Sequence, residues 1–172
     1  SNNSKSLEGS DLSIQISMKI RGEDPKSFVP DKLYSSHKYV IQHTITGALV
    51  SREYPLLVSK IFVVDPSKPE EEILKNGKVI IKGSSEAAIT RTNDNGNTLQ
   101  GSMKVQFTDV SYHHEKKYFA FKLCYFDPSK LDTPLFILVS PSFRTYARKP
   151  TVAESNNGSN QASSPGGEEQ QD

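Results

Sequence analysis

The sequence predicts an all-β protein, an antiparallel β-sandwich. Short runs of β-branched and aromatic residues recur through residues 11–150, and Gly, Pro, Asn and Asp punctuate them. Helical periodicity is almost absent, so no long amphipathic helices are available to connect parallel strands. About eight strands separated by turn residues are typical of two packed antiparallel sheets.

The first predicted strand is the clearest one. Apolar and polar residues alternate over the nine positions from Leu12 to Ile20. Because successive side chains of a strand point to opposite faces, the apolar residues share one half-buried face. That face consists of Leu12, Ile14, Ile16, Met18 and Ile20.

The remaining strands follow at short intervals. Residues 93–97, Asn-Asp-Asn-Gly-Asn, suit a tight connection because these residue types tolerate positive φ. Residues 69–74 are predicted to form one helical turn, since a proline and three glutamates stand at the end that the helix dipole favours. The predicted strands cover residues 39–45, 56–64, 78–82, 87–91, 99–107, 118–126 and 135–139, the last resuming through Phe143.

Composition divides the chain into three segments. Residues 1–10 are predicted to be a flexible N-terminus, residues 11–150 the sandwich, and residues 151–172 a disordered tail of Ser, Asn, Gly, Gln and Glu. Residues 11–150 hold 20 of the 21 Lys and Arg but only 15 of the 20 Asp and Glu, a net charge of +5. This charge favours an anionic partner only slightly, because a net charge of this size is also usual in proteins that need it only for solubility. No apolar run is long enough for a membrane span, so no membrane partner is expected.

The residue types that carry catalytic chemistry form no recognisable site. The run 113–115, His-His-Glu, is the best metal candidate, but neighbouring strand residues point to opposite faces, and a polar loop is the favoured interpretation. His37 and His43 have no partner at metal or triad spacing. Cys124, the only cysteine, lies in an aromatic strand and is expected to be a small core residue. We therefore expect no enzyme, no metal site and no cofactor.

Residues 140–150 are the strongest candidate for a binding surface. Just after the last strand they bring together three cations and an aromatic residue, Arg144, Tyr146, Arg148 and Lys149. Arginine can bind phosphates or the O6 and N7 atoms of guanine, lysine adds a point charge, and tyrosine can pack on a sugar or donate to a phosphate. A basic segment that merely leads out of the domain is the alternative. Residues that could widen the patch are Arg91, Lys104, Lys116, Lys117 and Lys122.

Four stretches of the sequence resemble the core of the CudA-like amoebal transcription factors, a family similar to the DNA-binding domain of STAT proteins. They are PLLVSK at 55–60, GSMKVQFTDVS at 101–111, YFAFKL at 118–123 and SPSFRTYARKP at 140–150. The resemblance, which spans residues 12–150, implies an immunoglobulin-like, p53-like sandwich. Such a domain binds double-stranded DNA through loops at one end and through the segment after its last strand. The DNA-contacting residues that it implies are Arg144, Arg148 and Lys149, with Arg91, Asn93 and Asn95 as further loop candidates.

The expected function is therefore that of a sequence-specific transcription factor acting in the nucleus. Nothing in the sequence reads as the coiled-coil, linker or phosphotyrosine-binding domains of a full STAT protein, so phosphotyrosine-mediated dimerisation does not follow. A homodimer or a transcriptional partner protein would have to use another surface. The alternative function is a non-catalytic sandwich that recognises proteins through an edge strand or a set of loops.

Overall fold

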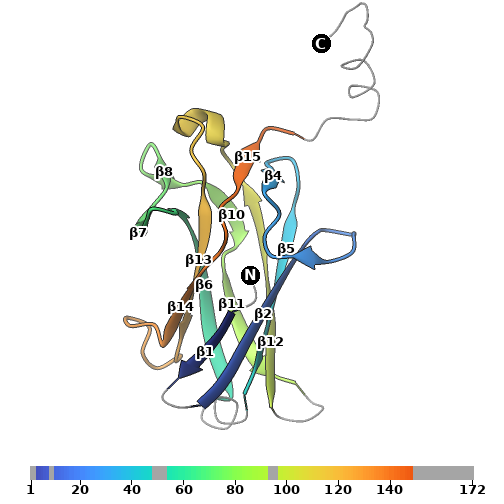
Figure 1. Ribbon diagram of the computed structural model, residues 1–172, viewed down its shortest axis with the longest axis vertical. Helices are drawn as coiled ribbons and strands as arrows, with labels where there is room; N and C mark the ends of the chain where they lie inside the picture. Colours follow the sequence, from blue (N-terminus) through green and yellow to red (C-terminus); the bar gives the residue numbers. More distant parts are fainter. Residues whose placement is uncertain (1–2, 8–9, 48–53, 93–96, 149–172) are drawn as a thin grey trace, which may run out of the picture.

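The protein is an antiparallel β-sandwich (Figure 1). The computed structural model describes residues 3–7, 10–47, 54–92 and 97–148. The main strands are β1 (Asn3–Leu7), β2 (Ser10–Ile20), β5 (Tyr39–Thr46), β6 (Leu56–Asp65), β11 (Glu86–Arg91), β12 (Thr98–Phe107), β13 (Ala120–Phe126) and β14 (Phe136–Val139). The shorter elements are β3 (Lys26–Ser27), β4 (Lys32–Tyr34), β7 (Lys68–Glu72), β8 (Leu74–Lys75), β9 (Lys78–Val79), β10 (Ile81–Ser84), β15 (Arg144–Tyr146) and the 3₁₀-helix η1 (Ser111–His114). Within these described ranges, no helix is long and apolar enough to cross a membrane.

The main strands form one curled sheet whose two halves pack face to face. Their order is β1-β2-β5-β12-β11-β6-β13-β14, and every neighbouring pair is antiparallel. The predicted alternation of β2 is confirmed, because Leu12, Ile14, Ile16 and Met18 are all buried. Across the interior, the rings of Phe107 in β12 and Phe121 in β13 lie 5.8 Å apart. The all-β antiparallel sandwich predicted from the sequence is thereby confirmed.

The chain crosses between the halves at β10 and β11. Strand β10 pairs with β12, whereas β11 pairs mainly with β6. Two glycines allow the close approach of backbones that this crossing requires. A Cβ atom at Gly83, whose φ is +110°, would lie 2.3 Å from the carbonyl oxygen of Lys104, and one at Gly101 would lie 2.5 Å from that of Ala88.

The predicted helical turn at residues 69–74 is wrong. Strand β7 covers most of it and pairs with β6 through a bulge between Val64 and Asp65. Asn76 and Gly77 then turn the chain with positive φ at both positions and join β8 to β9 in a hairpin. The predicted strand at 78–82 is accordingly divided between β9 and β10. Backbone pairing with β6 outweighs the local helix-start signal.

One buried polar pair links the two halves of the core. Nδ1 of His43 on β5 and the hydroxyl oxygen of Tyr125 on β13 are hydrogen-bonded at 2.8 Å. Burial lowers the pKa of His43 to about 4 and raises the pKa of Tyr125, so both side chains are neutral at pH 7. Nε2 of His43 has no hydrogen-bond partner among the described residues. Protonation of this imidazole therefore opposes folding.

We expect the free energy of unfolding to fall as the pH drops from about 6.5 to about 4. In this window the unfolded chain takes up a proton on His43 that the folded chain excludes, which removes up to about 3 kcal/mol. Urea unfolding at a series of pH values should show a flatter dependence for His43→Phe than for the parent. His37→Gln, at a partly exposed histidine, is the control and should keep the parental slope. Identical slopes for His43→Phe and the parent would contradict this assignment.

Candidate nucleic-acid interface

The basic segment after the last strand is tied to the fold. Phe143 is fully buried, and its backbone N–H and carbonyl each form a 2.8 Å hydrogen bond with Phe119. Strand β15 follows directly and pairs in parallel with β4, so that Arg144 lies opposite Lys32. Beyond it, the Oγ of Ser35 donates to the carbonyl of Ala147 at 2.8 Å. The segment is thus fixed to one end of the sandwich, where Figure 1 shows β15, β4 and η1 together.

We call this region the exit end and define it by β4, η1, β15 and residues 115–118. Arg144 is half-buried, and its guanidinium carbon lies 4.2 Å above the centre of the Tyr118 ring. Its Nε atom is buried and has no hydrogen-bond partner, and no ion pair within the described residues uses this arginine. Stacking on an aromatic face fixes the plane of the guanidinium group without neutralising it. Arg144 therefore keeps its charge at a fixed position.

Other cations and aromatic rings surround Arg144 at the exit end. Tyr146 is 36% exposed, and its ring centre lies 5.9 Å from that of Tyr34 on β4. Tyr112 of η1 is 72% exposed, with the ammonium group of Lys116 5.9 Å from its ring centre. Arg148 is exposed at the end of the last described range. The predicted contact residue Lys149 lies outside the described residues.

A buried carboxylate holds η1 in place. Asp109 accepts hydrogen bonds at 2.6 Å from Nδ1 of His113 and from Nε2 of His114, and its Oδ1 lies 3.4 Å from Nζ of Lys75. Burial alone would raise the pKa of Asp109. The hydrogen bonds from the two histidines outweigh this effect and lower that pKa to about 2. Ser111 extends the link, since its Oγ accepts from the backbone N–H of Thr145 at 2.8 Å. The 3₁₀-helix and β15 are thereby fixed together.

The expectation that His113 and His114 point to opposite faces of a strand is wrong. These residues lie in a 3₁₀-helix rather than a strand, so both imidazoles converge on one carboxylate. No group of three or more His, Cys, Asp or Glu side chains that could hold a metal ion occurs in the described part of the chain. Cys124 is buried, as expected of a small core residue, and burial raises the pKa of its thiol.

Arg91, the loop candidate that the structure describes, does not join the exit end. Arg91 is the last residue of β11, pairs with Leu99, and lines a polar hollow on the outer face of the sheet. Asn93 and Asn95 fall in residues 93–96, outside the described residues. Lys122 lies on β13 in the other half of the sheet, with its ammonium group 5.6 Å from the centre of the Phe62 ring. Of the lysines considered for a wider patch, Lys116 and Lys117 lie at the exit end.

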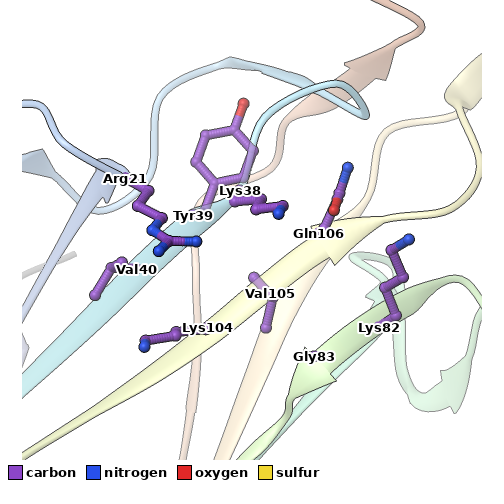
Figure 2. A pocket seen from close by; sticks show the side chains of 9 residues that line it. All are labelled: Arg21, Lys38, Tyr39, Val40, Lys82, Gly83, Lys104, Val105 and Gln106. Atoms are coloured by element: carbon purple, nitrogen blue, oxygen red, sulfur yellow. The ribbon is translucent and has the colours of Figure 1, made fainter.

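The structure also contains a groove that the sequence did not indicate. This cationic groove has a volume of about 200 Å³ and crosses the outer face of β5, β12 and β10, with Arg21, just after the end of β2, at one side (Figure 2). Four of its nine lining residues are Lys or Arg, and none is Asp or Glu. The lining residues are Arg21, Lys38, Tyr39, Val40, Lys82, Gly83, Lys104, Val105 and Gln106.

Of the four cations of this groove, the sequence predicts only Lys104 as a binding residue, because the four come from separate segments of the chain. Each of the three lysines stands next to a buried strand residue, as Lys38 does beside Tyr39 and Lys104 beside Val105. That local pattern indicates an outward-facing lysine, but only the register of the strands brings the lysines together.

No protein-family model matches the chain, and no curated protein matches it in sequence. The protein is an antiparallel β-sandwich with a cationic and aromatic end and an adjoining cationic groove.

Replacing Asp109 with Asn should destabilise the exit end. The neutral amide loses the charge-assisted bonds to both histidines, and we expect the free energy of unfolding to fall by about 1–3 kcal/mol in urea titrations. Glu115→Gln is the matched control. The Glu115 side chain is 84% exposed, and its ion pair with Lys117 has a long distance of 3.9 Å between Oε1 and Nζ. It should change the free energy by less than about 0.5 kcal/mol. Equal effects of the two variants would refute the structural role of Asp109.

Proposed function

We propose that this β-sandwich is the sequence-specific DNA-binding domain of a transcription factor, and that its exit end meets the bases of double-stranded DNA. The proposal depends chiefly on the way Arg144 is presented. Its backbone N–H donates to the carbonyl of Asp31 at 3.0 Å, and its guanidinium carbon lies over the Tyr118 ring, 4.2 Å from the ring centre. A planar fork held in advance suits bidentate hydrogen bonding to guanine, since little rotamer entropy is lost on binding.

The surroundings of Arg144 suit the rest of a nucleic-acid contact. Lys116, Lys117 and Arg148 offer positive charge for phosphates, and all three are exposed. The exposed hydroxyls of Tyr112 and Tyr146 can donate to phosphate oxygens, and their rings can pack on sugars. Elements fixed to the core hold these groups, which favours precise recognition over loose electrostatic attachment.

The resemblance of four sequence stretches to the CudA-like factors supports the same proposal. It adds an immunoglobulin-like, p53-like type of sandwich, a nuclear location and a non-catalytic role in regulating transcription. A second copy of the chain or a transcriptional partner protein would supply the other half of a palindromic contact.

One observation favours the alternative of a protein-recognition module. Strand β14 is the last strand in the sheet order, and Ile137 on it is 39% exposed. An extended peptide could add to such an edge through backbone hydrogen bonds. The two functions differ in their response to DNA, which the next experiment measures.

Binding to an array of duplexes should first identify a preferred DNA sequence. On that duplex Arg144→Lys, which keeps the charge but loses the planar fork, should weaken binding by about 1–3 kcal/mol in fluorescence anisotropy. Affinity for a random duplex should stay the same, because a lysine still attracts phosphate. Thermal unfolding of the variant checks that the fold is retained.

Lys130→Ala is the control, since Lys130 lies in the loop between β13 and β14 at the opposite end of the sandwich (Figure 1). It should leave the affinities for both duplexes unchanged. If Arg144→Lys and the parent bind the preferred duplex equally, the exit end does not read bases. If the parent binds no duplex at all, the protein-recognition alternative replaces the proposed function.

A further inference from the structure

We infer that the cationic groove binds phosphate groups of the DNA backbone, so that the bound duplex extends from the exit end onto the outer face of the sheet. This inference rests on the proposed function and adds a second contact surface to it. The groove would contribute affinity that does not depend on sequence, whereas the exit end would contribute specificity.

The strand register sets the spacing of the charges. Ile20 pairs with Tyr39, so Arg21 comes opposite Lys38, and the N–H of Arg21 donates to the Lys38 carbonyl at 2.8 Å. On the neighbouring strands, Gln106 of β12 pairs with Lys82 of β10. Adjacent strands are about 4.8 Å apart, so this row of outward side chains spans about 14 Å. That length is enough to contact several successive phosphates.

Like charges are crowded in this arrangement. Arg21 faces Lys38 directly, and Lys104 is a diagonal neighbour of Lys82. Like charges at such positions of a sheet repel each other when nothing lies between them. In Figure 2 the side chains of Arg21, Lys38, Lys82 and Lys104 surround Val40 and Val105. No carboxylate lines the groove. A bound polyanion would relieve the repulsion.

Carboxylates do occur nearby but belong to another hollow. Glu23 and Asp24 follow Arg21 in the chain and line an adjoining hollow together with Lys19, Lys26 and Lys32. The groove itself therefore keeps an excess of positive charge.

The size of the groove indicates part of a polymer rather than a small molecule. Its volume of about 200 Å³ is below the roughly 300–1,000 Å³ of typical ligand pockets. Its floor contains the partly buried side chain of Val40, against which the apolar edge of a sugar can pack, whereas the buried side chains of Tyr39 and Val105 point into the core. A phosphate with its sugar fits this combination of cationic rim and apolar floor.

The surface continues along the strands as a second, polar hollow of about 540 Å³. Gln42 lies two residues beyond Val40 on β5, and its partner Ser102 lies two residues before Lys104 on β12. Thr44, Gln100 and Arg91 also line this hollow. Hydroxyl and amide side chains also contact phosphates in DNA complexes, so the backbone of a duplex can follow the two strands past the groove.

The test is the salt dependence of binding to a random 20-base-pair duplex. In Lys82→Gln/Lys104→Gln two phosphate contacts are lost, so the slope of log K against log salt concentration should become shallower by about 1.8. Lys122→Gln/Lys130→Gln removes the same charge elsewhere and should keep the parental slope. Circular dichroism and thermal unfolding of both double variants verify folding.

The outcomes separate this inference from the function on which it rests. If the groove variant keeps the parental slope while the parent binds DNA, the groove is not a phosphate site and the proposed function stands. If both double variants lose slope equally, only net charge matters, and the inference is also overturned. If the parent binds no duplex, the proposed function fails first and the inference fails with it.

Discussion

Burial of Phe143 is the interaction on which the whole exit end depends. Its ring packs 4.7 Å from that of Phe121 and 5.8 Å from that of Phe107, which ties it to both halves of the sandwich. Burying an aromatic side chain of this size contributes about 2–5 kcal/mol, which offsets much of the cost of ordering the exit residues, about 1–2 kcal/mol for the backbone of each. Because Arg144 follows this anchor directly, a segment that would otherwise leave the fold is held along β4. Its charges therefore have fixed positions.

Tyr39 joins the exit end to the cationic groove. Tyr39 is one of the residues that line the groove, and its hydroxyl accepts the backbone N–H of Tyr34 at 2.7 Å. Burial raises the pKa of Tyr39 to about 12, so this hydroxyl stays neutral. Gln106 adds a second link, because its Nε2 donates to the carbonyl of Ser35 at 2.9 Å. A stiff duplex can use two surfaces together only when their separation is fixed, and these bonds fix it.

Local patterns predicted the strands and the basic segment at 140–150, but not the contacts that place this segment beside β4 and η1. Alternation locates β2 and the second half of β12 because a half-buried strand repeats its environment every second residue. No local pattern predicts the parallel pairing of Thr145 with Leu33, because these residues are far apart in the chain. Likewise, the convergence of His113 and His114 on one carboxylate needs a 3₁₀-helix that the sequence does not signal. The Asn76-Gly77 pair is a signal for a tight hairpin turn, but a proline followed by three glutamates is equally typical of a helix start. The groove depends on register across four strands, which only the folded sheet supplies.

A chemical-shift titration of the ¹⁵N-labelled protein with double-stranded DNA is the most direct test of a surface that runs from the exit end into the groove. We expect the largest amide shifts at Arg144 and Tyr112, at the exit end, and at Val40 and Gln106, in the groove, with little change around Lys130. Shifts that cluster around Lys130 or along β14, or no shifts at all, would contradict DNA binding at this surface.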